Sequence, residues 1–448
     1  MTALLYVLGV VAFVLAILAS IGLHELGHMI PAKAFGGKVT QYFIGFGPTV
    51  WSRQRGETEY GVKAIPLGGY VKIVGMLPPD KEHAGKVEYD AEGNRVVTVR
   101  KSNTGLFAQL VSDARAAEWE TITAADESRL FYRLAWWKKV VVMAGGPTVN
   151  LLIAFFIFGG LFATYGNPAD EVLHPTVSRV EACVVPAAED GRLCTPKDPV
   201  SPAHQAGLQV GDRFVSFNGT PVHDWTDMQD LIRHNANGAA TIVVERNGRQ
   251  LTLHTNTLVT PRPTNEKEPT KLTPVGFLGD SPTVTFTTGG PLYTIDQMGG
   301  LAKQSAQALA TLPVKVWGVA EAIAGVKPRA ADSPVSVVGG GRLAGETASA
   351  QDFPVKEKLV SLLGLVAGFN FFIGLFNFVP LLPLDGGHIA GAVWEALRRG
   401  LARLRRRPDP GYVDVARLLP IAYVVASFLL VMGVVLIVGD LVVPVQLS

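Results

Sequence analysis

The sequence predicts a polytopic α-helical membrane protein with four transmembrane helices and additional β-structure, a mixed α/β chain. Of its 448 residues, 48% are apolar and only 17% are charged, whereas a globular protein has about 25% charged residues. The deficit is localised: four stretches lack Asp, Glu, Lys and Arg, and each exceeds the roughly 20 residues with which a helix crosses a bilayer. These stretches are 2–23, 140–169, 359–384 and 418–439.

This composition excludes a wholly soluble enzyme and a disordered protein. A net charge of only +2 also excludes a nucleic-acid binder that relies on overall charge, so we expect no nucleic-acid partner. The first stretch could alternatively be a cleaved signal peptide. It has no basic region before it, no small-residue cleavage site and an apolar run longer than about 15 residues, so we interpret it as a membrane helix.

Basic residues near span ends indicate orientation, because they are retained on the cytoplasmic side. The segment 396–415 carries six arginines against Asp409 and Asp414, and we expect it to be a basic cytoplasmic loop. The arginines are Arg398, Arg399, Arg403, Arg405, Arg406 and Arg407. Four spans then put residues 35–138 inside, and residues 167–355 and both chain ends outside. The order of elements is a helix over 1–34, a cytoplasmic region over 35–138, a helix over 139–166, outer segments, and helices over 357–395 and 416–440.

The first span ends in an unusual motif for a membrane helix, His24-Glu25-Leu26-Gly27-His28. Histidines four residues apart lie on one helical face, so both imidazoles can reach one zinc ion at about 2.0–2.1 Å while Glu25 lies beside them as a base. The alternative is a pair of core histidines bonded to neighbouring helices. Ionisable groups within a span are costly and by default functional, so the motif predicts a metal site.

A catalytic zinc site needs a third protein ligand. Asp385 is the acidic residue at the exit of the third apolar stretch, and His388 follows it; spacing alone leaves both open as ligands. Pro380 and Pro383 prevent an unbroken helix just before them, and the freed backbone groups are tolerated at membrane depth only beside protein or a watery cavity. Hydrolysis within a bilayer requires such a cavity.

Together these motifs resemble the site-2 protease family of intramembrane zinc metalloproteases, in particular its bacterial branch, the regulator of sigma-E protease type, which cleaves membrane-bound anti-sigma factors. The resemblance covers most of the chain. The matching segments are His24–His28, Gly45-Phe46-Gly47-Pro48, Pro66-Leu67-Gly68-Gly69-Tyr70-Val71-Lys72, Gly146-Pro147-Thr148-Val149-Asn150 and Asn377 through Gly386.

The resemblance implies a zinc metalloendopeptidase, a hydrolase that performs regulated intramembrane proteolysis. It makes His24, His28 and Asp385 the ligands of one Zn²⁺ per chain, and Glu25 the general base. It also places Asn377 beside the active site, where it helps to hold the substrate. Pro380 and Pro383 belong to the same substrate-binding turn, with a wider spacing than in the family.

Residues 41–75 predict strands within the cytoplasmic region, because Gln41–Ile44 and Tyr70–Val74 are β-prone and bounded by glycines. An ordinary cytoplasmic hairpin is one interpretation. The resemblance instead implies a membrane-associated β-sheet whose free edge pairs with an unwound substrate segment. We expect Gly68, Gly69 and Tyr70 to form that edge.

The outer segment contains turn, strand and helix signals in an order that resembles a bacterial PDZ domain, over about residues 170–258. The most specific cue is Ala206-Gly207-Leu208-Gln209-Val210-Gly211-Asp212. Such domains recognise exposed chain ends or loops by strand addition, and in this family the domain is a substrate filter. Residues 259–355 follow as a polar linker and an amphipathic helix at 292–325.

The outer segment also holds the two cysteines of the chain, Cys183 and Cys194. Their position on the oxidising side favours one disulfide, with two free thiols as the alternative. The family expectation for the whole protein is a multi-pass protein of the bacterial inner membrane, with the active site near the cytoplasmic side and the PDZ domain extracytoplasmic. Its partners would be the lipid bilayer and single-span substrates such as an anti-sigma factor that an upstream site-1 protease has already trimmed.

Overall fold

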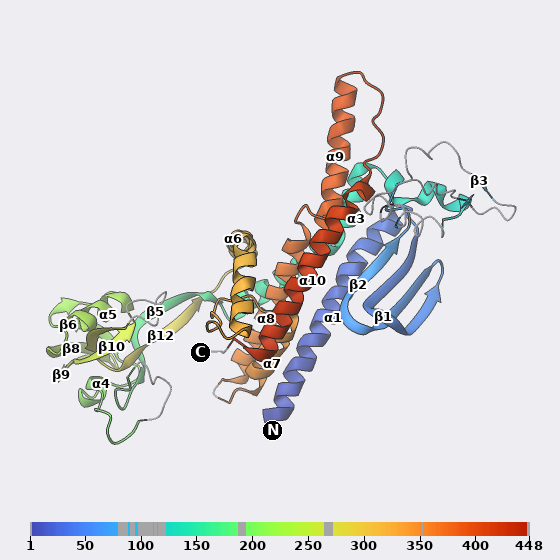
Figure 1. Ribbon diagram of the computed structural model, residues 1–448. Helices are drawn as coiled ribbons and strands as arrows, with labels where there is room; N and C mark the ends of the chain where they lie inside the picture. The colour runs from blue at the N-terminus through green and yellow to red at the C-terminus, as the bar shows by residue number, and fades with distance from the viewer. Residues whose placement is uncertain are drawn as a thin grey trace. The chain divides into compact units, whose positions relative to one another are not determined.

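The computed structural model describes residues 2–78, 122–186, 194–263, 272–351 and 353–445, with residues 88, 89, 95, 96, 111 and 114. The chain divides into two compact units. The helical unit comprises residues 1–161 and 290–448, and the β-rich unit comprises residues 162–289. Figure 1 shows their elements by label and colour.

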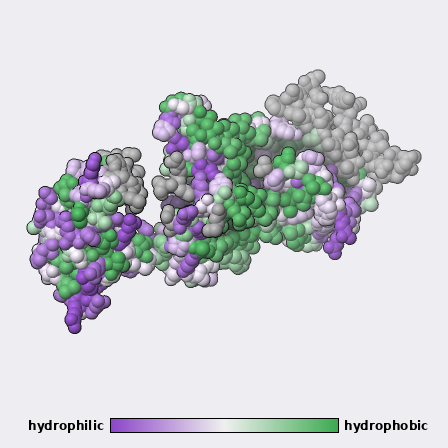
Figure 2. All heavy atoms as spheres, turned by 90° about the horizontal axis from the view of Figure 1, so that it is seen from below, coloured by the Kyte–Doolittle hydropathy of each residue, from purple (hydrophilic) through white to green (hydrophobic). Residues whose placement is uncertain are grey.

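Four helices of the described residues are long and apolar enough to cross a membrane, which confirms the predicted fold class. They are α1 (Thr2–Ala34), α3 (Trp136–Thr164), α8 (Val355–Asn377) and α10 (Leu419–Val442), the last preceded by a short 3₁₀ turn, η4 (Val415–Leu418). Figure 2 shows apolar side chains gathered over the surface of these helices, while the β-rich unit has a mixed surface. An apolar exterior is the normal state of a helix in contact with lipid.

The third span is shorter than predicted. Helix α8 ends at Asn377, and a turn over residues 378–384 leads into a separate helix, α9 (Asp385–Leu404). Pro380 and Pro383 lie in that turn, as their helix-breaking character requires. Residues 396–404, which we expected in the basic loop, continue α9, because Leu, Ala and Arg are strong helix formers. The non-helical part of that loop begins at Arg405.

Two further helices belong to the helical unit. Helix α6 (Pro291–Ile323) lies where we expected an amphipathic helix over 292–325. Helix α7 (Val337–Ser349) was not predicted, because its glycine-rich sequence has low helix propensity. Its glycines allow close packing on α1: a Cβ atom at Gly345 would lie 2.7 Å from the Tyr6 ring.

The two predicted strand segments near residues 41–75 belong to a long hairpin of β1 (Val39–Arg55) and β2 (Thr58–Ile73). Each strand bends back, so that Tyr42 pairs with both Val71 and Tyr60, and Trp51 pairs with Val62. The segments therefore lie in the order 69–73, 39–44, 58–65, 49–55 across the sheet. The segment Gly69–Ile73 is an edge, with a strand neighbour on one side only among the described residues. A smaller pair joins β3 (Glu88–Tyr89) to β4 (Arg95–Val96).

The last part of the connection from this sheet to α3 contains two 3₁₀ helices, η1 (Ala124–Arg129) and η2 (Phe131–Arg133). Two ion pairs attach η1 to the region around the hairpin. The Lys38 ammonium lies 2.9 Å from Asp126, and the Arg129 guanidinium lies 2.7 Å from Glu57. Both pairs hold the hairpin close to the start of α3.

The β-rich unit is built on one sheet in the order β12-β5-β6-β8-β9. Its elements are β5 (Asn167–Val180), α4 (Pro202–Gln205), β6 (Arg213–Phe217), β7 (Thr220–Pro221), α5 (Trp225–His234), β8 (Ala239–Arg246), β9 (Arg249–Asn256), β10 (Leu258–Pro263), β11 (Leu272–Phe277) and β12 (Asp280–Thr287). Phe214, Phe217, Met228 and Ile242 form its buried core. The unit extends beyond the predicted 170–258 because β12 pairs with β5, a contact between distant segments.

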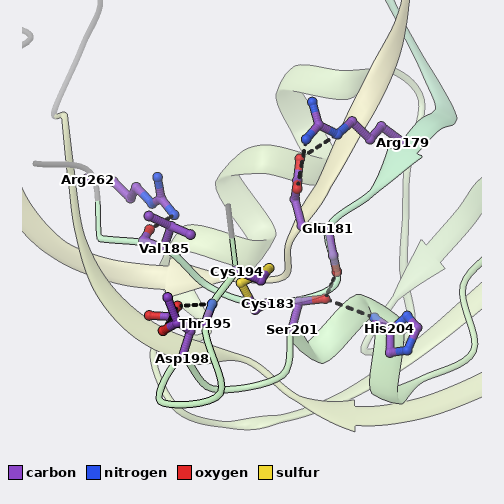
Figure 3. The surroundings of a disulfide bond; sticks show 10 residues. All are labelled: Arg179, Glu181, Cys183, Val185, Cys194, Thr195, Asp198, Ser201, His204 and Arg262. Carbon is purple, nitrogen blue, oxygen red and sulfur yellow. Dashed lines mark hydrogen bonds and ion pairs between the residues drawn. A yellow bond between two sulfur atoms is a disulfide. The ribbon is translucent and has the colours of Figure 1, made fainter. Parts of the chain in front are cut away.

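Cys183 and Cys194 form a disulfide bond in the β-rich unit (Figure 3). Hydrogen bonds organise the chain beside it: the Asp198 carboxylate accepts from the backbone N–H and the hydroxyl of Thr195, both at 2.7 Å. The Ser201 hydroxyl accepts from the His204 backbone N–H at 3.1 Å and donates to the Glu181 carbonyl. The bond therefore lies beside a hydrogen-bonded segment, residues 195–204, that leads into α4.

Candidate metal centre and catalytic cavity

The two motif histidines lie in the last turns of α1, on one face of an uninterrupted helix. The Nε2 atoms of His24 and His28 are 3.2 Å apart. The Val142 carbonyl on α3 accepts a hydrogen bond from His28 Nδ1 at 2.8 Å. That bond places the proton on Nδ1 and leaves the Nε2 lone pair free for a metal ion.

Asp385, the first residue of α9, completes the cluster. Its Oδ2 lies 3.5 Å from His24 Nε2 and 3.4 Å from His28 Nε2. The turn that delivers it is tight: a Cβ atom at Gly386 would collide with the carbonyls of Phe378 and Val379. Glycine at this position therefore lets the chain fold back so that Asp385 meets α1.

These three side chains fit a tetrahedral zinc ion. Ligand atoms at about 2.0–2.1 Å from a central zinc lie about 3.3 Å from one another, and the observed separations are 3.2, 3.4 and 3.5 Å. They are the residues that could hold a metal ion within the described part of the chain. Two imidazoles and one carboxylate leave the fourth corner of the tetrahedron open, as in catalytic zinc sites.

His388, the other ligand that the sequence left open, is not part of this cluster. It lies one turn further along α9 and lines the same cavity as Asp385. The geometry therefore brings together His24, His28 and Asp385, the set that the family resemblance implies.

Helix α3 reaches this cluster through two adjacent glycines. Gly145 lies against the Gly27 carbonyl of α1, and a Cβ atom at Gly146 would lie 2.8 Å from His24 Nε2 and still closer to His28 Nε2. A larger side chain at either position would occupy the space that the two helices or the metal ligands need. The site thus depends on close contact between α1 and α3.

Glu25 lies between the histidines and the edge of the sheet. A Cβ atom at Gly69 would be 3.1 Å from Glu25 Cγ, so the edge segment of β2 passes directly beside this carboxylate. The Tyr42 hydroxyl donates to the Gly22 carbonyl of α1 at 2.8 Å, which attaches the sheet to the helix one turn before Glu25. The sheet edge is therefore held next to the metal-binding face of α1.

A cavity of about 620 Å³ joins these groups. Of the ligand, base and substrate-binding candidates named from the sequence, ten line it, whereas Pro380 does not and is exposed. The ten are His24, Glu25, His28, Gly68, Gly69, Tyr70, Asn377, Pro383, Asp385 and His388. The lining also includes residues to which sequence analysis gave no role, among them Ile17, Ile21, Asn150, Val337 and Ile373. Of these, Asn150 had a recognisable signal, because it is polar within an apolar stretch and ends the family segment Gly146–Asn150.

Comparisons with known proteins agree with this geometry. The model of peptidase family M50 matches residues 12–409. The zinc metalloprotease Rip1 of Mycobacterium tuberculosis (strain H37Rv) is 34% identical, over 99% of this chain and 100% of the relative. Rip1 of Mycolicibacterium smegmatis is 32% identical over the same shares. The zinc metalloprotease RasP of Bacillus licheniformis is 24% identical, over 93% of this chain and 97% of the relative.

Proposed function

Since the chain belongs to peptidase family M50, the site-2 protease family of zinc metalloproteases, we propose that it cleaves single-span membrane proteins inside the bilayer, as a protease of regulated intramembrane proteolysis. One observation carries the proposal. A single cavity, bounded by spanning helices, contains the His24, His28 and Asp385 cluster, Glu25 and the free edge of a β-sheet.

In this mechanism His24, His28 and Asp385 would hold one zinc ion, which would supply a Lewis acid and lower the pKa of water at the site. Glu25 takes the proton from the attacking water and returns it to the leaving nitrogen of the peptide bond. Its place beside Gly69 supports this role, because a chain added to that edge would pass within reach of its carboxylate.

The sheet edge can provide the hydrogen-bond partners that an unwound substrate needs. A substrate helix hides its peptide bonds, and unwinding it in lipid leaves backbone groups unpaired, each at a cost of several kcal/mol. Gly68, Gly69 and Tyr70 at the edge of β2 would receive those groups by strand addition. Asn377 and Pro383 line the same cavity and would contact the same segment, while Pro380 lies in the turn between α8 and α9.

We further propose that the cavity opens near the cytoplasmic side of a bacterial inner membrane. The arginine-rich end of α9 and the loop after it would be cytoplasmic. Lys138 at the start of α3 would lie at the same interface, and Gly146 at the metal centre follows it by eight residues, or about 12 Å of helix. Strand β1 exposes Val50 and Trp51, which suits a sheet that dips into the membrane.

In the same topology the β-rich unit is extracytoplasmic, where the Cys183–Cys194 disulfide would be stable. We propose that this unit is a PDZ-like domain that filters substrates. The substrate class is a single-span protein such as an anti-sigma factor, shortened beforehand by a site-1 protease.

The test replaces Glu25 by Gln in the full-length protein. The variant should keep about one zinc per chain, because the three ligands are intact, while cleavage falls by at least about 1,000-fold with the loss of the base. A strain carrying Glu25→Gln should accumulate a single-span fragment that the wild-type strain lacks, and the purified wild-type protein should cut that fragment after reconstitution.

Cleavage of the fragment by Glu25→Gln at the wild-type rate would overturn the proposal. Metal analysis also distinguishes a protease from two other kinds of membrane protein, a scaffold and a zinc transporter. A scaffold that only binds partners should retain no zinc, and a zinc transporter should exchange it rapidly, whereas a protease retains it.

A further inference from the structure

Asn150 is a buried polar residue that the fold does not explain. It lies on α3 and is only 2% exposed, and its Oδ1 has no hydrogen-bond partner among the described residues. A buried acceptor without a partner costs about 1–3 kcal/mol. Amide side chains are also rare in spans unless they face a neighbouring helix or a cavity.

The position of Asn150 relates it to the metal centre. It follows Gly146 by four residues and so lies on the same face of α3, which at Gly146 meets the histidine ligands. Asn150 lines the cavity together with Glu25 and Asn377. Helix α8 packs closely on this part of α3, because a Cβ atom at Gly374 would lie 2.9 Å from the Pro147 carbonyl.

A substrate in this cavity has backbone groups on two edges. Strand addition to Gly69–Ile73 pairs one edge of the extended segment and leaves the other edge without partners. Within the membrane those remaining N–H and C=O groups need partners from the protein or from water in the cavity. An amide side chain supplies both a donor and an acceptor, and Asn150 has an unused acceptor in the cavity.

We propose that Asn150 binds the backbone of the unwound substrate on the edge that faces away from β2. Its Oδ1 accepts from a substrate N–H, and its Nδ2 donates to a substrate carbonyl. Asn377 provides the same chemistry from α8. This inference rests on the proposed function, because it assumes an extended peptide in the cavity.

The helical unit provides a matched control for this role. Asn370 on α8 is also an asparagine within a span and fully buried, and its Oδ1 likewise has no partner among the described residues. Its Nδ2 donates to the Val366 carbonyl at 2.9 Å, and it does not line the cavity. A purely structural asparagine should therefore behave like Asn370.

The experiment measures inhibitor binding to the full-length zinc-loaded protein, so that it needs no natural substrate. A peptide hydroxamate combines a zinc-binding group with backbone amides, whereas acetohydroxamate has the zinc-binding group alone. Asn150→Leu should weaken the peptide hydroxamate about tenfold or more, the effect of one or two lost hydrogen bonds. It should leave the zinc content and the Kd of acetohydroxamate unchanged. Asn370→Leu should change neither Kd.

Equal weakening of both inhibitors would overturn the inference, because Asn150 would then act through the metal centre. Unchanged binding of both would also overturn it. If Leu at position 150 lowers the zinc content, the smaller Asn150→Ala variant is compared with wild type by the same two inhibitors. If the wild-type protein binds both inhibitors and cleaves no membrane protein, the proposed function fails, while the inhibitor comparison still decides the role of Asn150.

Discussion

The two units of this chain are stabilised in different ways. The β-rich unit has a core of large apolar side chains such as Phe214 and Met228. Its Arg213–Glu245 ion pair is exposed, and its buried Asp212 carboxylate is paired with the part-exposed Arg246. The helical unit exposes many apolar side chains and buries ionic ones: the Lys139 ammonium is 2.8 Å from Glu395, and the Arg329 guanidinium is 2.8 Å from Asp440.

The difference follows from the solvent of each unit. In water, burial of apolar surface drives folding. In lipid that driving force is absent between helices, which associate through close contacts of small residues and through polar interactions. The glycine contacts between α1 and α3 and the buried ion pairs are therefore what we expect to position the metal ligands.

The largest expected effect tests the close contact of helices. Gly145→Leu should separate α3 from α1 and abolish both zinc binding and proteolysis, because the new side chain would collide with the Gly27 carbonyl. Gly364→Leu on α8 is the matched control, since a Cβ atom there meets no atom of the described residues within 4 Å. Zinc content per chain is the measurement. Normal zinc content in Gly145→Leu would show that the contact does not position the ligands.

The apolar core of the β-rich unit should give the next largest effect. Phe214→Ala should destabilise this unit by about 4 kcal/mol, the usual cost of removing a buried aromatic ring. Hydrogen exchange of β8 in the full-length protein measures the loss, and zinc content serves as the control. If Phe214→Ala also released zinc, the two units would not be independent in stability.

The metal centre of the helical unit could be predicted from the sequence only in part. The His24, Glu25 and His28 arrangement was predictable, because it depends on the local periodicity of one helix. Asp385 was preferred to His388 only through family resemblance, since the turn that brings it to α1 is a tertiary feature. Asn150 was visible as a polar residue, but its place on the cavity wall depends on how α3 packs.

Other features of the fold could not be predicted from the sequence for similar physical reasons. Helix α7 was missed because its glycines oppose a helix in isolation and favour one only when packed on α1. Strands β1 and β2 each bend and so form four paired segments, with Gly69–Ile73 at the edge. This arrangement depends on pairings that local strand propensity does not specify. Pairing of β12 with β5 likewise extended the β-rich unit beyond its predicted limits.

The buried ion pair between α3 and α9 should show a moderate effect. Lys139→Met leaves the Glu395 carboxylate, which is 2% exposed, with Arg399 as its remaining cation at 3.3 Å. We expect a loss of about 3 kcal/mol in the stability of α9, because the buried carboxylate loses the closer of its two cations.

The matched control is Arg213→Met, which breaks the exposed pair of the β-rich unit and should cost less than about 1 kcal/mol. Hydrogen exchange of α9 and of β6 gives the two values. Equal losses would mean that burial does not distinguish the ion pairs of the two units.

The smallest expected effect concerns a carboxyl group in the β-rich unit. Burial raises the pKa of Asp280 from 3.8 to about 7, and its Oδ2 has no hydrogen-bond partner among the described residues. The folded state therefore binds a proton more tightly than the unfolded state. Its contribution to stability is complete below about pH 4, falls as the pH rises to about 7, and is lost above that.

Asp280→Asn removes this titration while keeping the size of the side chain. Above pH 7 the variant should be more stable than wild type by about 1 kcal/mol. This is less than for a fully buried carboxyl group, because the Asp280 side chain is partly exposed. Hydrogen exchange of β5 and β12, corrected for intrinsic rates, should show the wild-type unit weakening between pH 5 and pH 8 and the variant unchanged. Asp230→Asn, on the exposed face of α5, should behave like wild type. A wild-type unit equally stable at both pH values would mean that water reaches Asp280, and that the β-rich unit excludes charge less strictly than its apolar core indicates.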